Sequence, residues 1–377
     1  MRKLCVLIIF IVLPLNFLLS KTKKDKTNEK VSTQTVKTEI SIAKKALEVI
    51  VLNLKNSDSD IKAYAIEALS RTNNSRLIPI IQKYLNDTSK YVIISTVKSL
   101  WNLGDIKSIT KIYDIISEVP ASDNSKNDPL TQLKIISQNK IREKAIETLV
   151  DLYGIKANKI LIELKNNDNY SQIRDAASRE LAKIGYKNEL ENFYTALNSS
   201  DEEIRNQAAE NLIRICPTES NKIISAIKKE KSIRVKILLL ESLKCAVLSK
   251  KDEEEILKYT NDDNQTIRYK SIKALLNSQN PKIIEELKKI YTDTPDIITK
   301  LTILKKLLQN QKIEVTESDV AYFNSLDNSE VKRKFIEIAE YIPSLSGKYL
   351  LSYLEDKDPY VQIDAAVKII EMEKKND

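Results

Sequence analysis

A nine-residue pattern recurs along almost the whole chain, about every 31 residues. A fixed period of this size is typical of stacked helical repeats. In its clearest copy, Ile61/Ala65/Leu69, an apolar anchor is followed by small or apolar residues four and eight positions later. The steps between successive anchors run from 29 to 34, except for one step of 49, and the copies at 233 and 297 are weaker. The ten anchors are Ile61, Val92, Ile141, Ile173, Ile204, Ile233, Ile267, Ile297, Val331 and Val361.

Each copy predicts a pair of helices. Residues spaced by four and eight share one face of a helix, so the pattern marks an amphipathic helix with a narrow apolar stripe. Asp58 and Asp201 stand three residues ahead of their anchors, where a carboxylate caps the first turn. Gly104, Gly154 and Gly185 stand at the twelfth or thirteenth position after their anchors, the usual place for a left-handed helix end. A second apolar-periodic stretch follows each turn, and no segment alternates as a strand does, so the chain is predicted to be all-α.

The consensus Asp-x-x-[Ile/Val]-[Arg/Lys]-x-x-Ala-[Ala/Ile]-x-x-Leu resembles the short HEAT-like repeats, of which the phycobilisome-lyase-type repeats are one branch. Asp58 to Leu69 and Asp201 to Leu212 match it best. The resemblance implies a right-handed α-solenoid of about ten stacked helix-turn-helix repeats, covering residues 39–377. It implies little about function, because such repeats serve as scaffolds, adaptors, lyases and nucleic-acid binders alike.

Residues 1–20 predict a signal peptide or an N-terminal membrane anchor. Arg2 and Lys3 precede an apolar run over 4–19, which is shorter than the roughly 20 residues of a spanning helix and fits a secretory signal. Residues 21–38 are polar and lysine-rich, and predict a flexible linker. We therefore expect an exported chain, either periplasmic or tethered and facing the periplasm, with cleavage left open. The alternative is a cytoplasm-facing anchor, because the lysines after the run oppose export.

The one long step between anchors contains an insertion. It exceeds the period by 18 (49 − 31), and the excess falls near residues 118–130. This stretch is polar and contains Pro120 and Pro129, so we expect a surface loop, either a tolerated insertion or a docking loop. The helix of Val361 and its charged tail are expected to form a terminal cap that needs no further neighbour.

The composition argues against catalysis. There is no histidine, which removes the commonest general base and transition-metal ligand. The four glycines include the three at expected helix ends, so no phosphate-binding glycine loop can form. We therefore expect that the chain is not an enzyme, and that it has no catalytic residue and binds no cofactor or metal. The formal net charge is +8, but residues 1–30 carry seven bases and two acids and so account for most of it. The repeats are therefore nearly neutral, and this argues against binding of nucleic acid.

A row of cations directly follows the anchors. Equivalent positions of stacked repeats align in space, so these side chains are expected to lie in a ladder. The resemblance to HEAT-like repeats favours structural pairs with the capping aspartates; the alternative is an anion-binding stripe. The ladder comprises Lys62, Arg142, Arg174, Arg205, Arg234, Arg268 and Lys332.

Tyrosine dominates the aromatic residues, with 16 copies against five Phe and one Trp. Seven tyrosines fall in the second helix of a pair, which in HEAT-like solenoids is expected to line the concave surface. Because tyrosine suits interfaces, we predict these seven as partner-binding residues, with packing between repeats as the simpler alternative. They are Tyr84, Tyr113, Tyr194, Tyr259, Tyr291, Tyr322 and Tyr353.

Two cysteines occupy the register of the helix-end glycines. Cys216 and Cys245 each stand at the twelfth position after an anchor (216 − 204 and 245 − 233). Packed helices lie roughly 8–10 Å apart, whereas a disulfide needs Cα atoms within about 7 Å. We therefore expect two free thiols; a bridge is the alternative, which export would permit.

The function predicted from these features is that of a non-enzymatic protein-binding scaffold or adaptor of the cell envelope. Its partner would be another protein, held on the concave surface, and it would touch the membrane only through its N-terminal segment. The alternative is a cytoplasmic nucleic-acid-binding protein similar to the HEAT-like DNA glycosylases, motivated by the cation ladder. A lyase acting on a prosthetic group is a third prediction, for which the sequence offers no site.

Overall fold

All ten predicted first helices form around or just after their anchors. The structure, a computed structural model, describes residues 42–120 and 128–376, and residues 43–377 form one unit. Within the described residues there is no strand, only a single β-bridge between Glu219 and Val247. The first helices are α2 (Ser59–Arg71), α4 (Lys90–Asn102), α6 (Pro129–Tyr153), α8 (Ser171–Lys183), α10 (Glu202–Ile215), α12 (Ile233–Ser242), α14 (Gln265–Leu275), α16 (Ile297–Gln309), α18 (Ser329–Ile338) and α20 (Pro359–Asn376).

Most second helices are shorter than the first helix of their pair, and they are often preceded or followed by a 3₁₀ turn. A further helix over residues 42–53 precedes α2. The second helices are α3 (Ile78–Ile81), α5 (Thr110–Ser117), α7 (Asn158–Asn167), α9 (Lys187–Ala196), α11 (Asn221–Lys229), α13 (Lys250–Lys258), α15 (Pro281–Asp293), α17 (Glu317–Ser325) and α19 (Pro343–Tyr353). The 3₁₀ turns are η1 (Ser75–Leu77), η2 (Gln82–Asn86), η3 (Lys107–Ile109), η4 (Gly154–Ala157), η5 (Leu243–Cys245), η6 (Tyr259–Asn261) and η7 (Ala339–Tyr341). The prediction of an all-α solenoid of HEAT-like helix pairs is thereby confirmed.

The local signals place the helix ends. The Asp58 side chain accepts hydrogen bonds from the backbone N–H groups of Asp60 and Ile61, and Asp201 caps α10 in the same way. Gly104 and Gly185 have φ values of 98° and 103°. Residues with a Cβ atom rarely adopt this backbone conformation. These residues therefore stop the first helices and turn the chain toward the second.

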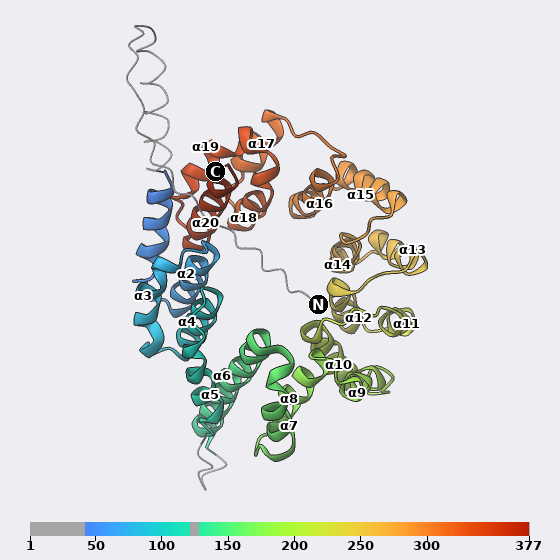
Figure 1. Cartoon of the computed structure of the whole chain (residues 1–377). Coiled ribbons are helices and arrows are strands. Elements are labelled where there is room, and N and C mark those ends of the chain that lie inside the picture. The colour runs from blue at the N-terminus through green and yellow to red at the C-terminus, as the bar shows by residue number, and fades with distance from the viewer. Residues whose placement is uncertain (1–41, 121–127, 377) are drawn as a thin grey trace, which may run out of the picture. The chain divides into compact units, whose positions relative to one another are not determined.

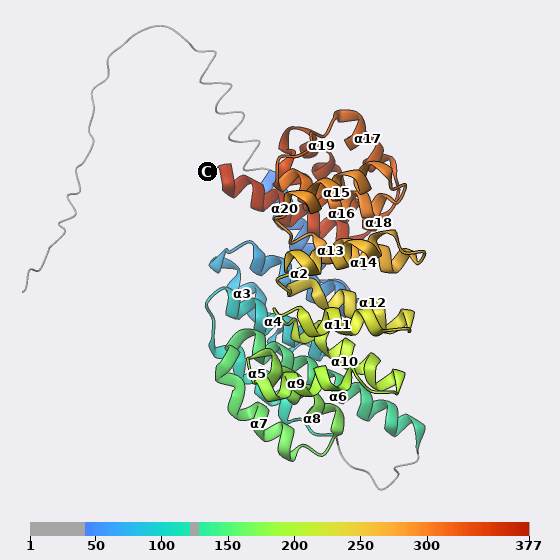
Figure 2. The same ribbon diagram turned by 90° about the vertical axis from the view of Figure 1, so that its right-hand side faces the viewer.

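The two helices of each pair lie in different layers. Figure 1 shows the even-numbered first helices along the inside of the row and the odd-numbered second helices along the outside, and Figure 2 shows the pairs from α9 to α16 stacked one above another. Each first helix packs on the next, from α2 to α20. Small side chains in the stripe, such as the fully buried Ala65 and Ala177, allow this close approach. The expectation that the second helices line the concave surface is therefore wrong, and the first helices line it.

The row closes on itself. Helix α20 packs on α18 before it and also on α2 from the other end of the unit. Its consecutive residues Ala365, Ala366 and Val367 are all 0% exposed, which requires neighbours on more than one face. The expectation of a terminal cap without a further neighbour is thus wrong. The reason is that α2 offers α20 the same kind of surface that every other first helix offers its successor.

One repeat is assembled from both ends of the unit. Among the described residues, α20 is the last first helix, and the helix over 42–53 comes before α2 in the position of a second helix. The two helices meet where Asn53 Nδ2 donates to Gln362 Oε1 at 3.3 Å, and Lys45 pairs at 2.7 Å with Glu355 in the turn before α20. Figure 1 shows this helix on the outside of the row beside α20. Together the two helices complete the closed row.

Two weak repeats are shifted by two positions from their predicted register. In α12 the buried stripe is Val235/Leu239/Leu243, whereas the predicted anchor Ile233 is 55% exposed. In α16 the buried stripe begins at Thr299 instead of Ile297. With anchors at 235 and 299, the steps from 204 to 331 become 31, 32, 32 and 32 (235 − 204, 267 − 235, 299 − 267, 331 − 299). The period is therefore more regular than the sequence pattern suggested.

The insertion is partly helical. Helix α6 has 25 residues, against 13 in α4 and α8, and it begins at Pro129 with Asp128 as its cap. Pro129 and Leu130, predicted as loop, therefore belong to the helix. Residues 121–127 of the predicted loop lie outside the described residues. Leu130 and Leu133 are 67% and 62% exposed, so the added turns of α6 extend past the neighbouring helices.

The predicted signal or anchor over 1–20 and the linker over 21–38 also lie outside the described residues. Among residues 42–120 and 128–376, no helix combines the length and the apolar character needed to cross a bilayer. The export prediction therefore remains a prediction.

Candidate functional site: the inner helix layer

Ion pairs join most neighbouring first helices of the inner layer. The charged residues lie on the first helices, between the buried residues of the stripe. From these positions they form ion pairs with the neighbouring first helix. Lys98 of α4 reaches Glu67 of α2, at 3.2 Å, and Lys270 of α14 reaches Glu241 of α12, at 2.8 Å. Further pairs are Arg234–Glu203, Lys305–Glu337, Arg333–Asp364 and Arg71–Glu371.

The most deeply buried of these contacts centre on Arg179 of α8. Its guanidinium reaches Glu143 at 2.9 Å and Glu147 at 3.0 Å, both on α6, and its Nε donates to Glu180 at 3.1 Å. The Arg179 side chain is 4% exposed, and that of Glu180 is 1% exposed. Because an arginine presents its donors in a planar fork, one side chain can bind three carboxylates in this way.

The pKa values of two carboxyl groups around Arg179, those of Glu143 and Glu180, are shifted in opposite directions. Burial opposes ionisation of Glu143, but Arg179, Gln172 and Arg214 outweigh it and hold the pKa of Glu143 below its usual value. Burial raises the pKa of Glu180 above its usual value, although Arg179 and Lys183 act against that shift. The Oε2 atom of Glu180 is also a buried oxygen without a hydrogen bond among the described residues.

The contacts of Arg214 show which face of α10 lies on the concave side of the row. Its Nη1 atom contacts Glu147 of α6 at 3.2 Å and also binds Glu143, past the intervening helix α8. Such a contact is available only on the concave side, where the first helices converge. Gln207 precedes Arg214 by two helical turns and is exposed, so it shares this face. The inner surface is thus polar, carries both signs of charge, and has many of its cations already paired.

A separate polar network lies where α20 packs on α2 and closes the row. The hydroxyl of Tyr64 in α2 binds Asp364 in α20, and Arg333 Nε in α18 donates to the same carboxylate at 2.7 Å. Arg333 also lies 5.6 Å from the ring centroids of both Tyr64 and Tyr360. Burial, followed by the Asp364 contact, raises the pKa of Tyr64 to about 12.

The predicted ladder cations stand on the first helices, and most of their side chains bind groups in the linkers between repeats. Lys62 pairs with Asp87 at 2.9 Å, and Arg142, with a side chain 1% exposed, pairs with Asp168 at 2.5 Å. Arg205 and Lys332 pair with an acid of the following linker, Glu230 at 2.8 Å and Asp356 at 2.7 Å. Arg174 and Arg268 donate instead to the carbonyl oxygens of Asp168 and Asp262, six residues earlier.

Arg234 does not belong to this ladder. Its predicted place in the ladder depends on the anchor at 233, and with the register shifted to 235 the equivalent residue is Lys236. Arg234 is instead an exposed residue that contacts Glu203 at 3.4 Å. Lys236 and Lys300 hold the true ladder positions of α12 and α16, and each lies 5.7 Å from a tyrosine ring of the outer layer, Tyr259 or Tyr291. A search for the most regular period would have found both.

The seven predicted tyrosines all lie in the outer layer. Tyr194 and Tyr353 are each 5% exposed, and Tyr84, Tyr113, Tyr259 and Tyr291 are half-buried; only Tyr322, at 56%, is exposed. Their assignment to the concave surface is therefore wrong, because that surface belongs to the first helices. A partner-binding role for the seven stays a prediction, and their burial fits packing within and between repeats.

Two of these tyrosines give a matched test of their packing role. The Tyr194 hydroxyl is buried without a hydrogen bond among the described residues, whereas the Tyr353 hydroxyl binds Asn324. Tyr194→Phe is expected to raise the free energy of unfolding by about 1 kcal/mol, and Tyr353→Phe to lower it by about 1 kcal/mol. Urea unfolding of the two variants measures both signs, and equal effects would contradict the assigned contacts.

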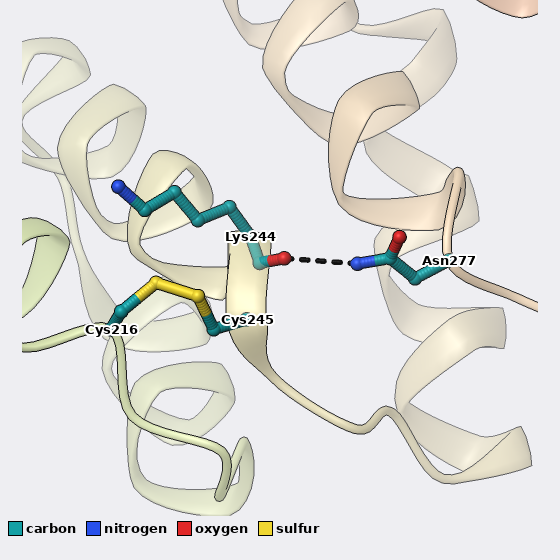
Figure 3. The surroundings of a disulfide bond; sticks show 4 residues. All are labelled: Cys216, Lys244, Cys245 and Asn277. Carbon is teal, nitrogen blue, oxygen red and sulfur yellow. Dashed lines mark hydrogen bonds between the residues drawn. A yellow bond between two sulfur atoms is a disulfide. The ribbon is translucent and has the colours of Figure 1, made fainter. Parts of the chain in front are cut away.

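Cys216 and Cys245 form a disulfide, with their Cα atoms 5.4 Å apart. Figure 3 shows the bridge between the end of α10 and the 3₁₀ turn after α12. The expectation of free thiols was based on the spacing of packed helices. It is wrong because both cysteines lie beyond the helix ends: Cys216 adopts a left-handed φ of 58°, and the two loops approach until Val247 N donates to Thr218 O at 2.9 Å.

The bridge also neighbours the next repeat. Asn277 Nδ2 donates to the carbonyl oxygen of Lys244, beside Cys245, at 2.9 Å (Figure 3). A cavity of about 550 Å³ is lined by Cys245, Val247 and Pro281, among others. Val247 is 77% exposed at its rim. The disulfide therefore fixes two successive repeats, and the hydrogen bond continues the connection to a third.

The described residues contain no group of three or more potential ligands that could hold a metal ion. No protein-family model and no curated protein matches the chain. Among solved structures, the crystal structure of Kap121p is similar over 85% of this chain and 36% of that chain, with 14% identity and a TM-score of 0.25. The structure of the Pds5–Scc1 complex is similar over 88% of this chain and 61% of that chain, with 15% identity and a TM-score of 0.30. The chain thus spans less than two thirds of either length, and its HEAT-like repeat fold rests on its own helix pairs.

Proposed function

We propose that the chain is a non-enzymatic protein-binding scaffold of the cell envelope whose working surface is the inner helix layer. The observation that carries the proposal is the array of first helices, fixed side by side by buried stripes and by ion pairs such as those of Arg179. A surface of this kind presents many side chains in fixed positions at little cost in ordering, which suits an extended contact with another protein. The ladder cations bind linker acids and carbonyls, so they give no support to a nucleic-acid role.

The inner-layer assignment can be tested by site-specific photo-crosslinking in cells that make the chain naturally. A photoreactive residue at Gln207, exposed on the inner face of α10, is expected to crosslink one defined protein. The same residue at Asn192, exposed on the outer helix α9, serves as the matched control. Crosslinking from residue 192 alone would move the binding surface to the outer layer, and crosslinking from neither would reject the scaffold.

The envelope part of the proposal is supported by the disulfide and by the predicted signal segment. Disulfides persist in oxidising compartments and are rare in the cytosol. We expect the repeat unit to resist protease in intact cells and to become accessible once the outer envelope is permeabilised. Alkylation before reduction should leave Cys216 and Cys245 unlabelled. Protection that lasts until the inner membrane is lysed, with both cysteines labelled, would place the chain in the cytoplasm.

A further inference from the structure

We propose that the junction between α2 and α20 is a latch at which the closed row of repeats opens, and that its opening admits a protein partner to the inner layer. The second half of this statement rests on the proposed function. The first half concerns the chain alone and can be tested without any partner.

The junction differs from all others in its covalent connection. Neighbouring first helices elsewhere, such as α10 and α12, are joined through one second helix and its two loops. Helices α2 and α20 are held only by contacts between residues some 300 positions apart, such as Tyr64 with Asp364 and Arg71 with Glu371. Separation of any other pair must strain the backbone or unfold a repeat. Separation here, with the helix over 42–53 leaving α20 together with α2, breaks only noncovalent contacts.

The contacts that span the junction include a polar network open to water. Arg333 Nε binds Asp364 at 2.7 Å and its Nη2 binds the Tyr64 hydroxyl at 3.1 Å, yet the Arg333 side chain is 42% exposed. The Arg71 and Glu371 side chains are 49% and 33% exposed. Water can replace such partners when the helices separate, so these contacts oppose opening less than a sealed apolar interface would.

A cavity of about 680 Å³ lies beside the network, lined by residues of α2, α16, α18 and α20, including Tyr64, Arg333 and Lys368. Its walls carry cationic and acidic side chains in equal number, several of them paired with one another. A pocket with balanced, paired charges offers no preference for a charged ligand. The cavity extends to the junction, so part of the surface that opening would expose is already accessible to water.

Hydrogen–deuterium exchange on the full chain tests the latch. In the wild type, amides of α2 and α20 are expected to exchange faster than those of α8 and α10. Arg333→Met removes both hydrogen bonds and the contact with two rings, and should accelerate exchange in α2 and α20 by about tenfold. Tyr64→Phe keeps the ring and removes only the hydroxyl, so it should give a smaller acceleration in the same helices.

Lys270→Met is the matched control, because Lys270 joins α12 to α14 by an ion pair in the middle of the row. It should leave exchange in α2 and α20 unchanged. Exchange in Arg333→Met that rises equally in all first helices, or that does not rise in α2 and α20, would overturn the latch. The crosslink from residue 207 is read separately, so its failure would reject the partner while leaving the exchange result in force.

Discussion

Replacement of Arg179 by methionine is expected to lower the free energy of unfolding by about 3–5 kcal/mol. The substitution would leave Glu180, with a side chain 1% exposed, and Glu143, at 16%, without their main cationic partner. Removal of one member of a buried charge network exposes the others to the full penalty of burial. Urea unfolding followed by circular dichroism measures the loss. The control Lys98→Met breaks a half-exposed pair with Glu67 and should cost at most about 1 kcal/mol.

The pH dependence of this effect has a defined sign. The folded-state pKa of Glu143 lies below its ordinary value of 4.5, so its ionised form stabilises the fold above that pH and the contribution is lost as the pH falls further. Glu180 has the opposite sign, because its raised pKa means that its ionised form opposes folding at neutral pH. The deficit of Arg179→Met should therefore shrink in acid. A deficit independent of pH would show that Arg179 acts through packing and not through its charge.

Deletion of residues 359–377 is expected to lower the melting temperature by about 10 °C or more. The deletion removes α20, whose Val361, Ile363 and Val367 are each 0% exposed, and it uncovers the faces of α2 and α18. Exposed apolar faces at both sides of the gap should also cause association, visible as a concentration-dependent increase in mass on size-exclusion chromatography.

A shorter deletion provides the control for this experiment. Removal of residues 375–377 keeps the buried stripe of α20 and loses only the exposed end, including the Lys375 pair with Glu340. It should change the melting temperature by about 2 °C or less. If both truncated chains melt like the full chain, the contact between α20 and α2 contributes nothing to stability, and the row behaves as an open solenoid.

The repeat fold was predictable because its information is local. Anchors such as Ile61, caps such as Asp58 and helix-end glycines such as Gly104 each act within one repeat, and the structure has them in those roles. The failures involve relations between repeats. Ile233 has an apolar side chain in a plausible position, and only the buried neighbours of Val235 reveal the true register.

The contact between α2 and α20 and the disulfide could not be predicted from the sequence for a similar reason. The contact between Tyr64 and Asp364 depends on a small rotation per repeat, accumulated around the whole row, and no single repeat encodes the sum. The pairing of Cys216 with Cys245 depends on how two loops run past their helix ends, which the helix period does not describe. The layer that the tyrosines occupy was misassigned because a helix pair has two faces, and the sequence pattern alone does not tell inside from outside.

The repeat built from α20 and the helix over 42–53 has a consequence for how this chain can vary. An open solenoid can gain or lose a repeat by duplication or deletion, since each new unit only lengthens the stack. In a closed row an added or missing unit would leave the two halves of the shared repeat unable to meet. We therefore expect the number of repeats to stay constant, and length variation between related chains to be confined to connecting segments such as the one before α6.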